Sequence, residues 1–379
     1  MFAYQQDGRF FAQTARGLDE LAGSELAELG ARDVESSGGG LHFCADAAAL
    51  YRINYCSRLV SRVLAALAQF HCPNDQALYA AARALEWDRI LSLEKTFAVF
   101  ASVQDSKISH AHYASLRLKD AIVDHFRERH GRRPDVDTEN PDLRIQLLIR
   151  QDQAQISLDT SGGSLHRRGY RVQSVAAPLQ ETLAAAMVRL SGWQGERPLV
   201  DPMCGSGTIV AEAFMHYCRI PAAYKRKKFG FENLPDFAPG VWAEVRRECD
   251  AAVREVPEGL IQGSDADRQA IDAARNNLRE LPGSRGVPLL RKDFRTLPGF
   301  RDATIICNPP YGMRLGELES ARSLYKEFGD FLKQRCPGST AFVLCGNLEL
   351  VSAIGLKPTR RFVLFNGPIE CRLLKIEIY

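Results

Sequence analysis

The sequence lacks long apolar stretches. No run of 18 uninterrupted apolar residues occurs among the 379 residues, although 45% of them are hydrophobic. The first ten residues, Met1 to Phe10, contain no apolar core of the kind that secretory signal peptides have. We therefore expect neither a membrane span nor a secretory leader, and we expect the protein in the cytoplasm.

Paired cysteines are also missing. The ten cysteines are scattered singly, without a C-x-x-C pair, and most have apolar neighbours. Structural zinc sites and disulfide frameworks use regularly spaced cysteine pairs. We therefore expect reduced thiols and no metal site.

An excess of one charge sign is absent as well. The 49 Lys and Arg residues nearly balance the 46 Asp and Glu residues, which leaves a net charge of +3. A strongly basic chain would by itself indicate a nucleic-acid partner, whereas this balance only permits one. The local basic run Lys225–Lys228, followed by Phe229 and Phe231, fits either a solvated face or an RNA contact.

Two α+β modules are predicted before residue 166, one over 1–60 and one over 61–165. The first follows a βαββαβ order, with its last strand ending at His71, which is typical of a ferredoxin-like module. The second combines a long helix over 111–130 with strands over 143–160.

A third region is predicted over 166–379, and from Pro198 onward its predicted strands and helices alternate strictly. Such alternation indicates a mostly parallel sheet with helices on both faces, and ligands bind beyond the carboxyl ends of its strands. The closing strands, over 362–365 and 373–378, fit an antiparallel hairpin at the edge. We expect this third region to be an α/β domain of the Rossmann-like kind.

A glycine-rich turn follows the first strand of this domain. Its glycines allow the backbone to approach a nucleotide-like cofactor closely. Neither G-x-G-x-x-G nor G-K-[ST] occurs there, which disfavours dinucleotide oxidoreductases and P-loop ATPases. The candidate cofactor-binding residues in this turn are Asp201, Pro202, Cys204, Gly205, Gly207 and Thr208.

Acidic residues follow the next two strands. A carboxylate at this place can accept hydrogen bonds from both ribose hydroxyls of a nucleoside, which is the role we expect for Asp265. Asp267 is a second candidate. Asp293 is suited to accept from an adenine amino group, and Phe294 to cover the ring. Asp267 and Asp293 also fit plain capping roles.

The fourth strand ends in Asn308, Pro309, Pro310 and Tyr311. The two prolines fix the backbone and aim a side-chain amide and a backbone carbonyl into the cleft. Two such acceptors can hold an exocyclic amino group of a base and orient its lone pair. Tyr311 can stack on an extruded base. We predict these four residues to be catalytic.

Cys204 and Cys307 flank this predicted site and suggest a covalent cysteine mechanism as an alternative. A nucleophilic cysteine would stand just after the proline of this loop, where the sequence has Pro310 and Tyr311. We therefore reject a covalent mechanism and interpret both thiols as packing residues.

The segment before the α/β domain is basic and aromatic. Arg167, Arg168, Tyr170 and Arg171 are candidate RNA-binding residues, since they offer phosphate contacts and stacking. The same residues equally fit a latch that holds the linker on the catalytic domain through salt bridges.

The four strand-end elements resemble class I methyltransferases that act on amino groups, with residues 201–208 as motif I and 308–311 as N-P-P-Y. Residues 159–171 are similar to the D-T-S-G-x-x-L-x-x-R-G-Y-R signature of THUMP-domain methyltransferases. Together the two matches cover nearly the whole chain. The chain looks most like bacterial 23S rRNA guanine-N2-methyltransferases of the RlmL type.

The resemblance implies a seven-stranded class I methyltransferase domain after ferredoxin-like and THUMP modules, with S-adenosylmethionine as cofactor. The implied product is N2-methylguanosine in 23S rRNA, formed in a single reaction because a second, fused methyltransferase domain is lacking. No obligate protein partner is expected. The half that begins near Val172 should fold and bind the cofactor alone, with the N-terminal half capturing RNA.

Three alternatives stay open. A tRNA guanine-N2-methyltransferase would use the same machinery. A DNA or RNA adenine-N6-methyltransferase is a second alternative, because N-P-P-Y suits any exocyclic amino group. An RNA-binding assembly factor with a degenerate catalytic half is the third, and the intact Asp201, Gly205, Gly207, Asp265 and Asn308 argue against it.

Overall fold

The computed structural model describes residues 1–174, 178–313 and 316–379 and divides into two compact units, each with one seven-stranded sheet. The first unit comprises Met1–Thr14, Ala22–Leu165 and Arg226–Arg247, and the second comprises Ala15–Leu21, His166–Lys225 and Glu248–Tyr379. Each unit is described by itself below.

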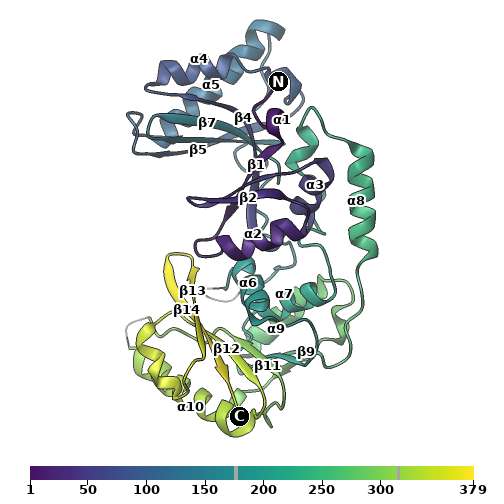
Figure 1. Cartoon of the computed structure of the whole chain (residues 1–379), viewed down its shortest axis with the longest axis vertical. Coiled ribbons are helices and arrows are strands. Elements are labelled where there is room, and N and C mark those ends of the chain that lie inside the picture. Colours follow the sequence, from purple (N-terminus) through teal and green to yellow (C-terminus); the bar gives the residue numbers. More distant parts are fainter. Residues whose placement is uncertain (175–177, 314–315) are drawn as a thin grey trace. The chain divides into compact units, whose positions relative to one another are not determined.

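The sheet of the first unit has the order β2-β3-β1-β4-β7-β6-β5 (Figure 1). Its strands are β1 (Arg9–Thr14), β2 (Arg32–Ser37), β3 (Gly40–Cys44), β4 (Val60–His71), β5 (Phe97–Gln104), β6 (Leu143–Arg150) and β7 (Gln153–Asp159). Its main helices are α1 (Tyr4–Asp7), α2 (Asp19–Glu28), α3 (Ala47–Cys56), α4 (Asp75–Arg83) and α5 (Ala111–His130). The predicted βαββαβ order and the second α+β module are both present.

Strand β4 is shared by the two modules. Its first half pairs antiparallel with β1, from Val60 opposite Thr14 to Ala65 opposite Phe10. Its second half pairs antiparallel with β7, as far as His71 opposite Gln153. The two modules therefore form one continuous sheet, and the border that we predict between 60 and 61 falls at the start of a strand that both modules use.

The sheet of the second unit has the order β10-β9-β8-β11-β12-β14-β13. Five strands are parallel, namely β8 (Leu199–Asp201), β9 (Ile261–Asp265), β10 (Leu289–Arg291), β11 (Thr304–Cys307) and β12 (Thr340–Cys345). The hairpin of β13 (Arg360–Asn366) and β14 (Ile369–Glu377) is the antiparallel edge. The helices of the second half are α6 (Glu181–Ser191), α7 (Thr208–Tyr217), α8 (Pro239–Ala251), α9 (Arg268–Arg279) and α10 (Leu318–Arg335).

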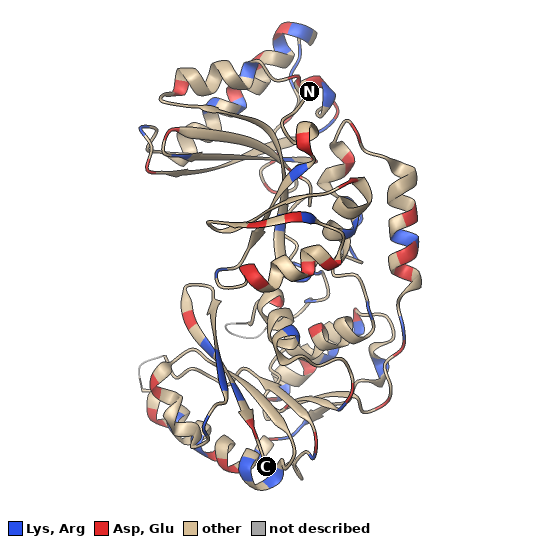
Figure 2. Cartoon of the chain, viewed as in Figure 1, with Lys and Arg blue, Asp and Glu red and all other residues tan. Residues whose placement is uncertain are grey.

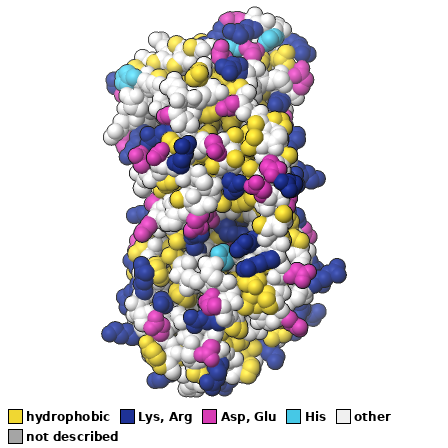
Figure 3. Space-filling model, turned by 45° about the vertical axis from the view of Figure 1, so that its right-hand side comes forward, with side chains coloured by type: hydrophobic (Ala, Val, Ile, Leu, Met, Phe, Trp, Pro, Cys, Tyr) yellow, Lys and Arg dark blue, Asp and Glu magenta, His cyan; other side chains and the backbone are white. Residues whose placement is uncertain are grey.

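Charged side chains avoid the middle of this sheet. Strands β8, β9, β11 and β12 carry no Lys or Arg (Figure 2). Their only acidic residues are Asp201 and Asp265 at the carboxyl ends. On the molecular face in Figure 3, Lys and Arg side chains are interspersed with Asp and Glu. The carboxylates at the strand ends are thus exceptions to the pattern, which points to a function at that edge.

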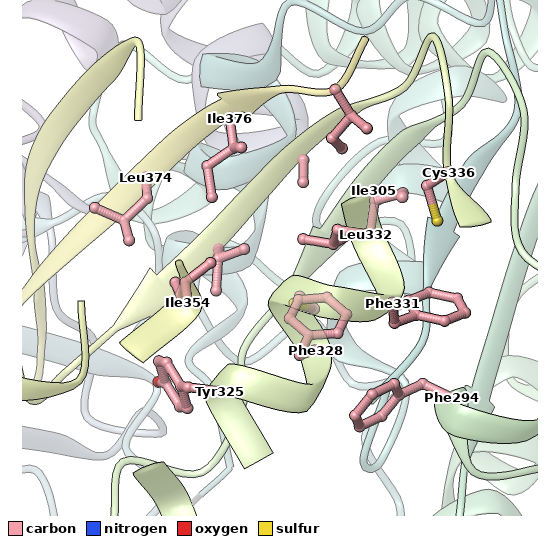
Figure 4. Packing of buried hydrophobic residues seen from close by; sticks show 14 of the residues in the cluster. Phe294, Ile305, Tyr325, Phe328, Phe331, Leu332, Cys336, Ile354, Leu374 and Ile376 are labelled. Atoms are coloured by element: carbon pink, nitrogen blue, oxygen red, sulfur yellow. The ribbon is translucent and has the colours of Figure 1, made fainter. Parts of the chain in front are cut away.

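One face of the sheet packs against α10. Tyr325, Phe328 and Phe331 of α10 lie over strand residues that include Ile305 and Leu374 (Figure 4). The rings of Phe328 and Phe331 also contact Phe294 edge-on, with centroids 5.3 and 5.7 Å apart. Since truncating a buried Phe costs about 3–5 kcal/mol, this aromatic layer holds the loop after β10 firmly in place.

Residues 226–247, an insertion between α7 and β9, belong to the first unit. The ring of Phe231 packs on Tyr51 of α3 at 4.5 Å, and Trp242 packs edge-on against Tyr55 at 5.3 Å. The backbone N–H of Ala238 donates to the Tyr51 hydroxyl at 2.9 Å. A segment from the second half of the sequence therefore completes the core of the N-terminal unit.

Within the described residues, no helix is both long enough and apolar enough to cross a membrane. The same parts of the chain hold no cluster of three or more His, Cys, Asp or Glu side chains placed to bind a metal ion. None of the ten cysteines is in a disulfide.

Candidate active site

The carboxyl ends of β8, β9 and β11 and the loop after β10 line one pocket of about 630 Å³ in the second unit. Twelve of the fourteen residues predicted for cofactor binding and catalysis are in its wall. They are Asp201, Pro202, Cys204, Gly205, Thr208, Asp265, Asp293, Phe294, Asn308, Pro309, Pro310 and Tyr311. Gly207 and Asp267 do not line it.

The motif I turn is built around a buried carboxylate. Asp201 is 1% exposed, and its Oδ1 accepts from the backbone N–H of Met203 at 3.2 Å. Burial, with a smaller effect from the nearby Asp265, raises the pKa of Asp201 well above its usual value. Asp201 therefore orders the turn and favours its protonated form.

Gly207 acts through packing. Its φ of +80° is a conformation that side chains rarely adopt, and an added Cβ would lie 3.0 Å from the Cβ of Ala274 in α9. The glycine therefore lets α7 start next to α9, which indirectly shapes the turn. Gly207 does not line the pocket, and the direct cofactor contact that we predicted for it stays a prediction.

Asp265 is held in one orientation by the backbone. Its Oδ2 accepts from the N–H of Gly205 and its Oδ1 from the N–H of Asp267, both at 2.9 Å. Each carboxylate oxygen has two lone pairs, so both oxygens keep capacity for further donors in the pocket. This arrangement suits the two hydroxyls of a ribose.

Asp267 and Asp293, for which we considered both cofactor binding and capping, differ in where they lie relative to the pocket. Asp267 caps α9 by accepting from the N–H of Gln269 at 2.9 Å, and it lies outside the pocket wall, so the plain capping role fits it. Asp293 lines the pocket, although it also accepts from the N–H of Arg295 and pairs with that side chain at 3.2 Å. Next to it, the buried Phe294 presents an apolar surface to the pocket.

The loop after β11 carries an unusual polar atom. The Oδ1 of Asn308 is buried and has no hydrogen-bond partner within residues 1–174, 178–313 and 316–379. A buried acceptor without a donor costs about 1–3 kcal/mol, a cost that a donor on a bound ligand or a water would offset. Pro309 and Pro310 follow directly and restrict the backbone.

Tyr311 is fixed by residues far away in the sequence. An added Cβ at Gly346, directly after β12, would lie 2.4 Å from the Tyr311 ring, so only glycine leaves room for this ring. The Nδ2 of Asn366 donates to the Tyr311 hydroxyl at 3.4 Å, and the thiol of Cys371 lies 3.8 Å away. Burial raises the pKa of Tyr311, so the phenol stays protonated.

Sequence reasoning missed Gly346, Asn366 and Ile369. Asn366 and Ile369 line the pocket from the β13–β14 hairpin, 55 residues or more after Tyr311. The N-G-P turn at 366–368 was a visible signal for a tight hairpin, but nothing local connects this hairpin with the N-P-P-Y loop.

The two cysteines near the site are packing residues. Burial raises the pKa of both Cys204 and Cys307 well above its usual value, and the nearby Asp201 raises both further. A raised pKa disfavours the thiolate, which is the nucleophilic form. Burial of the two thiols therefore disfavours covalent catalysis by either one.

The linker arginines latch the chain. Arg168 and Tyr170 are 2% and 1% exposed, and both lie next to the buried carboxylate of Glu212, at 3.5 and 3.1 Å. Arg171 donates to Glu181 at 3.0 Å and to the hydroxyl of Thr208 at 3.1 Å.

Burial leaves Arg168 and Tyr170 no surface for RNA, so the latch replaces the RNA contact predicted for these two residues. Arg171 is half-buried and donates hydrogen bonds within the protein. Of the four candidate RNA-binding residues, Arg167 is the exposed one. The basic run after α7 is also partly engaged, since Arg226 donates to the carbonyls of Ser161 and Ser164 at 3.0 and 2.8 Å.

The D-T-S-G segment closes the core of the first unit. The Ser161 hydroxyl donates to Asn54 Oδ1 at 2.8 Å and accepts from the N–H of Val63 at 2.9 Å. Asp159 is fully buried against Arg62. These signature residues thus fix the end of β7, and their role is structural.

Family models match three consecutive parts of the chain. An RlmL ferredoxin-like domain matches residues 9–64, a THUMP domain matches 72–159, and an RMKL-like methyltransferase domain matches 168–375. The last match alone covers more than half of the chain and contains every residue of the pocket wall.

Relatives match along the full length of the chain. The "Putative RNA methyltransferase slr0064" of Synechocystis sp. is 41% identical, over 98% of this chain and 97% of that protein. The "Ribosomal RNA large subunit methyltransferase K/L" of Syntrophotalea carbinolica is 42% identical over 98% of this chain. The match spans only 53% of that longer protein.

Solved structures show the same architecture. The crystal structure of SMU.472 complexed with SAH has a TM-score of 0.87 at 28% identity, with 98% of each chain covered. A Listeria monocytogenes protein described as a "predicted N6-adenine-specific DNA methylase" has a TM-score of 0.85 at 28% identity, with 100% of this chain and 99% of that chain covered. With its ferredoxin-like, THUMP and catalytic domains all matched and its strand-end residues gathered in one pocket, the chain belongs to the RMKL-like methyltransferase family and uses S-adenosylmethionine.

Proposed function

We propose that the protein is an RNA methyltransferase that forms N2-methylguanosine in 23S rRNA. The observation that carries this proposal is the buried Oδ1 of Asn308, an acceptor without a donor in the described residues, in the wall of the cofactor pocket. An exocyclic amino group of a base supplies the missing donor. We also propose a cytoplasmic location, which an rRNA substrate supports.

The residues present fit S-adenosylmethionine. Asp265 would hold the ribose hydroxyls, because both of its oxygens keep acceptor capacity while backbone N–H groups fix their position. Asp293 and Phe294 would hold the adenine, and the turn at Gly205 would let the protein backbone approach the cofactor closely. When bound, the cofactor supplies a methyl group already activated on sulfonium.

The chain itself contributes mainly orientation. Asn308 Oδ1 and the Pro309 carbonyl accept the two hydrogens of the amino group, which aims the nitrogen lone pair toward the methyl donor. The two prolines hold both acceptors in place before the base arrives. Tyr311, packed on Gly346, offers a rigid ring for stacking.

The names of the relatives support an rRNA substrate. Two relatives, from Syntrophotalea carbinolica and Photobacterium profundum, carry the name ribosomal RNA large subunit methyltransferase K/L, and this chain matches 53% and 52% of their lengths. A pocket for one flipped base reads little of the surrounding RNA. The THUMP and ferredoxin-like modules are therefore the parts that we expect to select the RNA, with Arg167 as an exposed contact near the linker.

The test is nucleoside mass spectrometry after incubation of the purified protein and S-adenosylmethionine with unmodified transcripts. The substrates, compared in separate reactions, are 23S rRNA transcripts, tRNA transcripts and unmethylated double-stranded DNA. We expect N2-methylguanosine in the 23S rRNA reaction alone. N6-methyladenosine as the product, or methylation confined to tRNA or DNA, would contradict the proposal.

A substitution tests the role of Asn308. Asn308→Ala should lower turnover by about a hundredfold or more, because it removes one of two acceptors that orient the amino group. Cofactor affinity, measured by titration calorimetry, should stay near the wild-type value. The matched control is Cys307→Ala, one residue earlier, which should keep turnover within a few-fold. Normal turnover of Asn308→Ala would remove the amino-capture mechanism.

A further inference from the structure

Asn366 brings a second amide to the pocket in which Asn308 lies. It is the last residue of β13 and pairs with Ile369 at the start of β14. Only Gly367 and Pro368 separate the pair, and Gly367 has a φ of +61°, so the turn is tight and its backbone is fixed. The Asn366 side chain therefore projects from a rigid support.

The amide of Asn366 contacts Tyr311. Its Nδ2 donates to the Tyr311 hydroxyl at 3.4 Å, and the Tyr311 ring cannot retreat because it lies against Gly346. With Nδ2 on the tyrosine side, Oδ1 takes the other side of the planar amide. Within residues 1–174, 178–313 and 316–379, Oδ1 makes no hydrogen bond. The pocket thus holds a second acceptor that has no protein donor.

We infer that Asn366 selects guanine against adenine, an inference that rests on the proposed function and names its specificity residue. Beside its N2 amino group, guanine has an N1–H donor, followed by the O6 acceptor. With the amino group held at Asn308, Asn366 Oδ1 accepts from N1–H, and the second Nδ2 hydrogen is available to O6.

Adenine presents the opposite pattern. Its N6 amino group neighbours N1, which is an acceptor, so N1 and the Asn366 Oδ1 would face each other without a hydrogen between them. In the amide orientation that donates to Tyr311, the Asn366 atom that faces N1 is an acceptor. A site built around a hydrogen bond rejects a base that cannot make it, because the polar groups of the site stay unpaired.

The test uses the full chain and a synthetic RNA. The guanine methylated in 23S rRNA transcript is first mapped by mass spectrometry, and two fragments are made with guanine or 2-aminopurine at that position. 2-Aminopurine keeps the reacting amino group but lacks N1–H and O6. We expect the wild-type kcat/KM to be at least tenfold higher for guanine.

Two variants test whether Asn366 causes the preference for guanine over 2-aminopurine. Asn366→Ala should lower kcat/KM on guanine to the value on 2-aminopurine, so that the ratio approaches one. Asn366→Asp keeps an acceptor for N1–H and should retain most of the preference. Unchanged S-adenosylmethionine affinity in titration calorimetry shows that both variants keep an intact catalytic domain.

Equal wild-type rates on the two bases, or an unchanged ratio in Asn366→Ala, would overturn the role of Asn366 while leaving the proposed function intact. Absence of any guanine methylation by the wild type would instead overturn the proposed function, and this inference with it.

Discussion

Asp201 and Asp265 end neighbouring parallel strands, but their surroundings give them different roles. Asp201 is buried and fixes the motif I turn, whereas Asp265 is partly exposed and is oriented by two backbone N–H groups toward the pocket. At the residue scale, burial and hydrogen bonding separate the carboxylate that orders the turn from the one that we propose to hold the ribose.

Removal of the Asp265 side chain should weaken binding of the cofactor. Hydrogen bonds to a charged group contribute about 1.5–3 kcal/mol, so Asp265→Ala should lower S-adenosylmethionine affinity at least tenfold in titration calorimetry. Asp267→Ala is the matched control. It should lower the free energy of unfolding by about 1 kcal/mol through loss of the α9 cap but leave affinity within about threefold. Equal affinity losses in both variants would show that the ribose site is misplaced.

The raised pKa of Asp201 predicts a pH-dependent stability. Burial, followed by the charge of Asp265, raises this pKa in the folded protein. The folded state therefore binds the proton more tightly than the unfolded chain. The contribution of protonated Asp201 to the free energy of unfolding is complete below about pH 4, the pKa of this group in the unfolded chain. It is lost as the pH rises through the pKa of Asp201 in the folded protein.

Asp201→Asn keeps an acceptor for the Met203 N–H but carries no charge. Relative to wild type, its free energy of unfolding should rise more at pH 8 than at pH 5, as measured by urea unfolding without cofactor. A difference that is the same at both pH values would contradict the assigned burial of the carboxylate.

At the scale of elements, α10 is positioned by a close backbone approach. An added Cβ at Gly329 would lie 1.7 Å from the carbonyl oxygen of Ile354. Gly329→Ala should therefore lower the free energy of unfolding by about 2 kcal/mol or more, although alanine is the better helix former.

Gly240 in α8 provides the control, because an added Cβ there has no heavy atom within 4 Å. Gly240→Ala should raise the free energy of unfolding by about 0.5–1 kcal/mol through reduced freedom of the unfolded chain. Both values come from urea unfolding. A neutral Gly329→Ala would mean that α10 can shift away from Ile354 at little cost.

At the scale of the whole molecule, the sequence halves do not coincide with the compact units. We expected a chain that begins near Val172 to fold alone, but such a chain would lack Arg168 and Tyr170, which lie at Glu212. It would also lack Tyr51 and Tyr55, on which the aromatic residues of 226–247 pack. That expectation is therefore corrected.

The corrected prediction compares two truncated chains. One that begins at Val172 should aggregate, because the rings of Phe229, Phe231 and Trp242 lose their cover. One that begins at His166 and carries a short Gly-Ser linker in place of 226–247 should be more soluble and bind S-adenosylmethionine. Light scattering and titration calorimetry give the readouts. A monodisperse, cooperatively folded chain from Val172 would contradict the structural role of the insertion.

The sequence by itself determined the elements and the principal strand-end residues. Apolar periodicity, turn residues and strand–helix alternation depend on neighbours in the chain, so the strands and the N-P-P-Y loop could be located in advance. Parallel strands place their carboxyl ends at one edge, which is why Asp201, Asp265 and Asn308 could be predicted to share a site.

Tertiary structure alone decided which distant segments complete that site and which basic residues are buried. Asn366 and Gly346 reach Tyr311 only because β12 lies beside β11 and the β13–β14 hairpin follows next to β12 in the order of the sheet. Whether Arg168 contacts RNA or Glu212, and to which unit residues 226–247 belong, depends on packing between segments far apart in sequence. Local patterns carry no record of such contacts, because their free energy arises only when the remote surfaces meet.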